Sequence, residues 1–368
     1  MYFRLYKGIG KERIGVFAAR SGVSLLNRLN LNYFGGLRCL SENAGTMASE
    51  EKCSNGKRKA GSLSDMGDVE KSSKIHKAWD KVFGPLGLSA LGVKEEIGKT
   101  RPRTHVNPLN AHFQVPIDTP KWEELYEDTS KPLFIDIGCA AGRFGMKMAT
   151  DPDFSKQNHL GIEIRESLVT RANAWVEKKG LKNIAYLSCN VNVCLEMLIE
   201  TYPGPVNYVA VQFPDPHFKR KHHKRRVVKN DFLDMLAKKL KPGTHFFVQS
   251  DVEEAAAQMR DRTELNKYFS RKEEDKYTPR DSDLALTVCA EGSDDSLWAR
   301  DGKRGKPSAG DSDANDYGDW LIGPNPLGVP TEREVQNECQ GLPIYRAMFV
   351  RNSVVWEASE NNVKNSSK

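Results

Sequence analysis

The stretch LFIDIGCAAGR, residues 133–143, decides how this sequence folds, because a short apolar run leads directly into a turn of small residues. Strands that alternate with helices predict a parallel sheet, and their almost continuous apolar character predicts helices on both faces. We therefore expect an α/β fold with a doubly wound sheet. The later run LPIYRAMFVRN should return to the sheet edge. The other apolar runs are HLGIEI (159–164), IAYLS (184–188), NYVAVQF (207–213) and THFFVQS (244–250), with amphipathic stretches between them.

The regions on either side of these runs differ from them in composition. Residues 47–100 are rich in Lys, Ser, Glu and Gly, which predicts a polar linker with a possible short helix. The folded domain is expected over 101–355, interrupted by an acidic, disordered insertion at about 281–319. A disordered tail at 356–368 follows, and 1–46 precedes the linker as a separate segment.

The first 46 residues have the composition of an organelle transit peptide. Before Ser41 seven basic residues are mixed with apolar ones and face a single acid, Glu12. This predicts a chloroplast or mitochondrial protein. The alternative is translation from Met47, which would give a nuclear or cytoplasmic protein.

Composition also excludes several classes of protein. No apolar run approaches the roughly 18 residues that span a bilayer, so no membrane interaction is expected. The seven cysteines are scattered without a C-x-x-C pair, which favours a reducing compartment and no metal site. The net charge of +6 is modest for a nucleic-acid binder, so the distribution of the charge matters more than its size.

The carboxyl ends of three predicted strands carry groups suited to an adenosine. The turn at Gly138 would let a ligand approach the backbone, and Glu163 could grip ribose hydroxyls, while the amide of Asn190 could pair with an adenine edge. A plain strand-to-helix turn or a nicotinamide site would share parts of this pattern. Asp136 would repel a pyrophosphate and attract a sulfonium and an amino group, so S-adenosylmethionine is favoured.

The segment QFPDPHFKRKHHKRR, residues 212–226, follows the fourth strand. Asp215 is held between two prolines, and seven Lys and Arg residues follow before Asp231 without an acid among them. An ordinary turn residue and a solvated charged face are the alternatives to a functional role. Next to the crevice, however, the basic run is placed to bind RNA phosphates, and we assign this role to Lys224, Arg225 and Arg226.

This segment resembles the hallmark of the tRNA (guanine-N7)-methyltransferases of the TrmB type, which is FPDP followed by a His/Lys/Arg cluster. The resemblance runs from about Arg101 to Arg351 and includes R-T-H-V-N-P at 103–108 and T-E-R-E at 331–334. It implies the mostly parallel, seven-stranded, Rossmann-like sheet of class I S-adenosylmethionine-dependent methyltransferases. It also implies a cofactor site, which we take to comprise Asp136, Gly138, Glu163, Arg165, Asn190, Val191 and Gln212.

The same resemblance makes Asp215 the catalytic residue. Lys219, Asp251 and the segment Thr331, Glu332, Arg333 and Glu334 would contact the substrate or line the pocket. Asp251 could instead cap the helix that follows it. Two departures from the family pattern are Ala140, which replaces a glycine, and Asn190, which stands where bacterial members have Asp.

The expected activity is transfer of a methyl group from S-adenosylmethionine to N7 of a guanine in tRNA, and the resemblance suggests the variable loop. A methyltransferase that acts on another RNA, a protein or a small molecule is one alternative, and a non-catalytic RNA-binding scaffold is another. The family's nuclear and cytosolic eukaryotic members work with a repeat-protein partner, whereas bacterial members act alone. The targeting-like N-terminus favours action without a partner.

Overall fold

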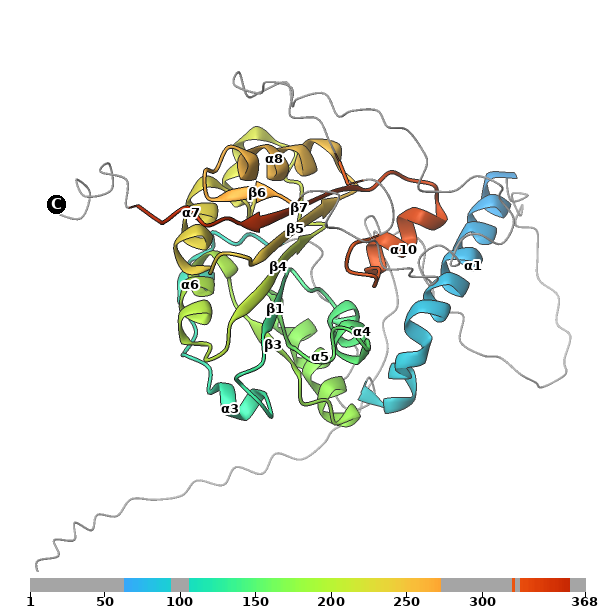
Figure 1. Ribbon diagram of the computed structural model, residues 1–368. Helices are drawn as coiled ribbons and strands as arrows, with labels where there is room; N and C mark the ends of the chain where they lie inside the picture. Colours follow the sequence, from blue (N-terminus) through green and yellow to red (C-terminus); the bar gives the residue numbers. More distant parts are fainter. Residues whose placement is uncertain (1–62, 94–105, 273–319, 322–324, 358–368) are drawn as a thin grey trace, which may run out of the picture. The chain divides into compact units, whose positions relative to one another are not determined.

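The computed structural model describes residues 63–93, 106–272, 320–321 and 325–357 (Figure 1). The expected transit peptide and acidic insertion lie outside the described residues, as do residues 47–62 of the linker and most of the tail.

One sheet of seven strands forms the centre of the domain, in the order β3-β2-β1-β4-β5-β7-β6. The first five strands are parallel, and only β7 runs antiparallel to its neighbours β5 and β6. The predicted doubly wound, mostly parallel sheet is thereby confirmed. The strands are β1 Leu133–Ile137, β2 Asn158–Glu163, β3 Ile184–Ser188, β4 Val206–Gln212, β5 His245–Ser250, β6 Phe269–Arg271 and β7 Tyr345–Arg351.

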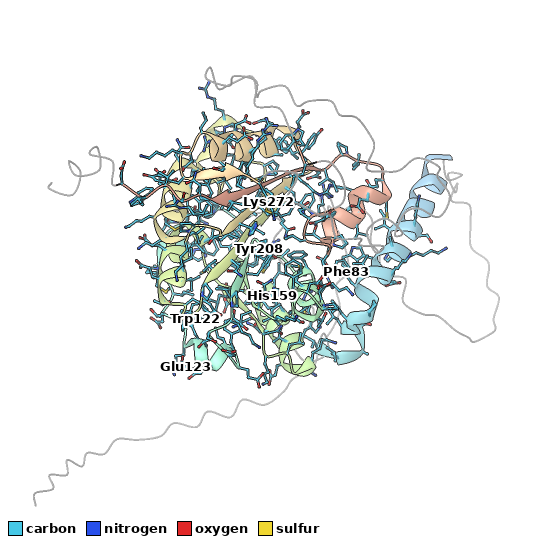
Figure 2. The ribbon with its side chains drawn as sticks, viewed as in Figure 1. Phe83, Trp122, Glu123, His159, Tyr208 and Lys272 are labelled. Atoms are coloured by element: carbon cyan, nitrogen blue, oxygen red, sulfur yellow. The ribbon has the colours of Figure 1, made fainter. Side chains whose placement is uncertain are left out.

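Helices cover both faces of the sheet because successive residues of each buried strand point to opposite sides. Ile135 of β1 packs in a cluster with residues of α6 and α7, whereas its neighbour Phe134 packs with α4 and stacks on Tyr208, with ring centroids 5.5 Å apart. Figure 2 shows Tyr208 inside the domain. The helices are α3 Trp122–Leu125, α4 Arg143–Thr150, α5 Glu166–Lys179, α6 Val191–Thr201, α7 Asn230–Lys239, α8 Glu253–Glu264 and α10 Glu332–Cys339.

We expected the last strand, β7, at the sheet edge, but the structure does not place it there. It pairs with β5 on one side and with the three-residue strand β6 on the other, so β6 forms the edge. A strand of three residues is too short to show a periodic apolar pattern, and the sequence therefore gave no sign of it.

Within the segment expected as a polar linker with a possible short helix, 47–100, the structure describes residues 63–93 and shows a helix longer than expected. Helix α1, Leu63–Phe83, occupies 21 of these residues and lies beside α10 (Figure 1). Its apolar residues Ala78 and Val82 are buried in a cluster with Trp175 of α5 and Val335 of α10. Polar composition averaged over the segment concealed this i, i+4 pair, which buries one face of the helix. Among the described residues no helix has the length and apolar character to cross a membrane.

Candidate functional site

The turn after β1 rests on a buried aromatic ring. A Cβ at Gly142 would come within 2.7 Å of the ring of Tyr186, so only glycine fits there, and the Tyr186 hydroxyl donates a hydrogen bond to the Gly142 carbonyl. Gly138 has φ +80°, and a Cβ on it would meet nothing within 4 Å. The turn is therefore supported on one side by Tyr186 and is open at Gly138, as a ligand-binding turn requires.

Glu163, at the carboxyl end of β2, joins this turn to the start of α5. Its buried carboxylate accepts a 3.1 Å hydrogen bond from the Ala140 N–H. The Arg165 side chain donates two more, from Nε and Nη2 at 2.9 Å each. These contacts join two predicted site residues, Glu163 and Arg165, to the turn at Ala140, and ribose hydroxyls would have to share the carboxylate with Arg165.

Asp136 lies in β1 with 6 % of its surface exposed. Burial raises the pKa of its carboxyl from 3.8 to about 7, although a 3.2 Å hydrogen bond from Gln212 lowers this pKa and the charge of Glu163 raises it further. Burial makes the ionised form of Asp136 costly, and a cation next to the carboxylate would stabilise that form. Asp136 therefore fits the positively charged sulfonium and amino group of S-adenosylmethionine. No cluster of possible metal ligands occurs in the described part of the chain.

A row of buried polar side chains crosses three strands behind Asp136. Strand register places Gln212 of β4 opposite Gln249 of β5, and Gln249 opposite Arg346 of β7. Arg346 can only donate and Glu334 can only accept, so the oxygen of Gln249 must face Arg346, at 3.1 Å, and its amide nitrogen must face Glu334 and Gln212, at 3.3 and 2.8 Å. Gln212 therefore presents its own NH₂ group to Asp136.

Glu334 is not available to a substrate, which corrects the expectation for this residue. It is 0 % exposed and completes a capping box with Thr331 at the start of α10. It also accepts hydrogen bonds from Arg346 at 2.5 Å and Asn325 at 2.8 Å. Its role is therefore to fix the start of α10 against the sheet.

The two residues between Thr331 and Glu334 hold α10 to other parts of the site. Glu332 forms an ion pair with Arg143, and Arg333 donates to Asp251 from Nη2 at 2.6 Å. Asp251 does not cap α8, because the N-cap position of that helix is Val252. These charged groups remain partly exposed and line the region around the start of α10.

Asn190 lies at the carboxyl end of β3 and is used differently from our expectation. Its Oδ1 caps α6 by accepting from the Asn192 N–H, and its Nδ2 donates to the Pro108 carbonyl, both at 3.1 Å. Val191 follows it as the buried first residue of α6. The amide can meet an adenine edge only if the contact with Pro108 opens.

The loop that carries Asp215 is fixed near the cofactor turn. Its first residue, Phe213, has φ +49° and donates its N–H to the Gln249 carbonyl at 2.8 Å. Asp215 itself is exposed, and its charge helps to raise the pKa of Arg165: burial lowers that pKa, but Glu163 and Asp215 together outweigh the effect. The bond to Gln249 anchors the loop beside the buried polar row behind Asp136.

The basic run folds into a 3-10 helix, Arg220–Arg225, and its members are not equivalent. Lys219 and Lys224 are exposed, and Arg225 is partly buried. Arg226 is only 7 % exposed and donates to the Pro216 carbonyl at 2.7 Å, to Gln258 at 2.5 Å and to Glu254 at 2.9 Å. The phosphate-binding role predicted for Arg226 is wrong in this conformation, because its donors already hold the loop.

Sequence reasoning missed a contact that joins α1 to the site. The guanidinium of Arg143, the first residue of α4, lies 4.7 Å from the ring centroid of Trp79 and 5.1 Å from that of Trp175. The same guanidinium pairs with Glu332 of α10. Gln249 and Arg346 were also missed, although polar residues at the ends of apolar strands were a signal that could have revealed them.

The chain is similar to known methyltransferases. A family described as a putative methyltransferase matches residues 130–293. The tRNA (guanine-N(7)-)-methyltransferase of Synechococcus elongatus is 38% identical over 257 residues, which is 69% of this chain and 98% of that protein. The protein of the same name from a second Synechococcus strain is 40% identical over 252 residues, covering 68% of this chain and 86% of that protein. A solved aminoglycoside resistance methyltransferase, NpmB1, is 18% identical, with a TM-score of 0.33, and the match covers 63% of this chain and 93% of that chain.

Proposed function

The chain belongs to the tRNA (guanine-N7)-methyltransferase family, and we propose that it transfers the methyl group of S-adenosylmethionine to N7 of a guanine in the variable loop of tRNA. The observation that carries this proposal is the position of the Asp215 loop. Its first residue, Phe213, donates its N–H to the Gln249 carbonyl, and the Gln249 side chain donates to Gln212, which in turn donates to Asp136. This position supports adjacent sites for cofactor and acceptor at the carboxyl edge of the sheet.

The buried residues of the site fit the cofactor. S-adenosylmethionine supplies an electrophilic methyl group on a positively charged sulfur. Asp136 offers negative charge to this cation, and Glu163 offers lone pairs to the ribose hydroxyls once Arg165 shares them. Gln212 keeps a hydrogen-bond donor on Asp136, which favours the ionised form that attracts the cation.

The residues that face the acceptor orient it and compensate its charge. Guanine N7 carries an in-plane lone pair, so methyl transfer requires no prior removal of a proton. Asp215 accepts hydrogen bonds from the N1 and N2 edge of the base, which aligns N7 and stabilises the positive charge that moves onto the ring. Lys219, Lys224 and Arg225 bind phosphates, which positions the RNA without reading its sequence.

A methylation assay with the full chain tests this function. Unmodified tRNA transcript is incubated with the protein and methyl-labelled S-adenosylmethionine, and the product is mapped by chemical cleavage at N7-methylguanosine. We expect one labelled guanine in the variable loop, strong loss of label with D215A, and full activity with D118A, which removes an exposed carboxylate just before α3. Label at another site would refute the loop assignment, and full activity of D215A would refute the role of Asp215.

We further propose that the protein acts in a chloroplast or mitochondrion and does so without a partner subunit. The basic, acid-poor composition of residues 1–46 supports the location. A fluorescent protein fused to these 46 residues should enter an organelle, whereas diffuse fluorescence would favour translation from Met47. Activity of the purified chain alone in the methylation assay is the corresponding test for independence from a partner.

A further inference from the structure

Phe218 exposes a large aromatic ring three residues after Asp215. Its side chain is 59% exposed, and it is the only aromatic residue among the strongly exposed large apolar side chains of the described residues. Because more than half of this ring stays in water, the folded chain lacks part of the stabilisation that its burial would give. Single exposed apolar residues are common on protein surfaces, so exposure alone assigns no role.

The exposure of Phe218 does not result from a loose loop. The Phe213 N–H is bonded to the Gln249 carbonyl at one end, and the Pro216 carbonyl is bonded to Arg226 at the other. His217, directly before the ring, has φ +46°, a left-handed conformation that is unfavourable for a residue other than glycine. Strained backbone persists only where surrounding contacts hold it in place, so Phe218 projects from a segment with a fixed conformation.

The surroundings of the ring define the chemistry of its partner. Lys219, Arg220 and Lys221 follow it and are exposed, and Asp215 is the only acid between Phe213 and Asn230. A protein partner would need a broader apolar surface around the ring than these cations provide. A single ring flanked by cations matches an unpaired nucleotide, whose base stacks on the ring while its phosphates meet the basic side chains.

We propose that Phe218 stacks on an unpaired base of the tRNA loop that presents the target guanine, an inference that rests on the proposed function. Asp215 and Phe218 are three residues apart, so their Cα atoms lie within about 11 Å of each other. That span matches one or two nucleotides of a single strand. Asp215 then contacts the edge of the target base, and Phe218 holds the face of a base in the same loop.

Binding of unmodified tRNA by four full-length variants tests the proposal. F218A should weaken tRNA binding by about 5- to 150-fold. F218L retains apolar bulk without a π face and should remain weak, whereas F218W should bind like the wild type. L265A removes an equally exposed apolar side chain, 58% exposed, at the end of α8, and should change nothing. Binding of S-adenosylmethionine should be the same in all four variants, which reports an intact fold.

Fluorescence gives an independent readout. Addition of tRNA should quench the emission of F218W more than that of the wild type, because a stacked base contacts the added indole. Wild-type affinity of F218A, full rescue by F218L, or no additional quenching in F218W would each overturn the proposal. Methylation by the wild type is measured separately. A wild type that binds tRNA without methylating it would count against the proposed function, while the binding series would still decide the role of Phe218.

Discussion

Replacing Asp136 with asparagine should stabilise the empty protein at high pH while it weakens binding of the cofactor. The folded-state pKa of Asp136, about 7, lies above its ordinary value of 3.8 because of burial, so the folded protein holds this proton more tightly than the unfolded chain. Stability associated with the protonated form is fully present below about pH 4 and is lost as the pH rises to about 7. At pH 8 the buried charge therefore lowers the free energy of unfolding of the wild type, whereas D136N has no such charge.

The size of this effect follows from the pKa values. At pH 8 Asp136 is ionised in both the folded and the unfolded state, so the full pKa difference, from 3.8 to about 7, lowers the free energy of unfolding. At 1.36 kcal/mol per pH unit this is about 4 kcal/mol. At pH 5 the acid is mostly neutral in the folded protein, and only the interval from 3.8 to 5 counts. The advantage of D136N over the wild type should therefore grow by about 3 kcal/mol between pH 5 and pH 8.

Urea unfolding of the cofactor-free wild type and of D136N at both pH values measures this difference. Comparing the two pH values cancels any effect of the substitution that does not depend on protonation. Calorimetric titration with S-adenosylmethionine at pH 8 should show at least tenfold weaker binding by D136N, because the carboxylate is lost. An advantage of equal size at pH 5 and pH 8 would refute the reasoning about Asp136.

Three other substitutions test separate parts of the site. Ala140 has φ +48°, so A140G should raise stability by about 1 kcal/mol and increase the thermal midpoint, whereas a lower midpoint would show that the turn is unstrained. R226M should lower both stability and kcat because it frees the Pro216 carbonyl, while K224M should only weaken tRNA binding and its salt dependence; similar behaviour of the two would contradict their different roles. E334Q removes a group that can only accept a hydrogen bond and so weakens the constraint on the orientation of Gln249 and, through it, of Gln212. Loss of the Gln212 donor would raise the pKa of Asp136, so the pH midpoint of cofactor binding should move upward, and an unchanged midpoint would mean that Gln212 is oriented without Glu334.

Six of the strands and the edge of the sheet at which the candidate site lies could be predicted because both depend on local patterns. Each apolar run of the sequence became a strand, and the polar residues Asp136, Glu163 and Asn190 indicated where ligand-binding groups should lie, at the carboxyl edge of a parallel sheet. Ala140 was recognised as a departure from the family pattern. Its left-handed backbone shows that the turn keeps the conformation that glycine would adopt more easily.

Roles that depend on contacts between distant segments could not be predicted in this way. Arg226 belongs to a basic run, and only its three partners distinguish it from Lys224. These are Pro216 in the loop after β4, and Glu254 and Gln258 in α8. Glu334 likewise shares a motif with partly exposed neighbours, yet burial against Arg346 gives it a different role. The sequence shows which residue types are present, but contacts in the folded protein determine which of their hydrogen-bond donors and acceptors remain available to a ligand.

Helix α1 limits where a processing protease could cut this chain. Trp79 covers the guanidinium of Arg143, and Ala78 and Val82 fill a cluster that would otherwise face water. Cleavage beyond these residues would expose that apolar surface and release Arg143 from one of its two aromatic neighbours. If import removes an N-terminal peptide, the cut must fall before Ala78 for the mature enzyme to keep the support behind its cofactor turn.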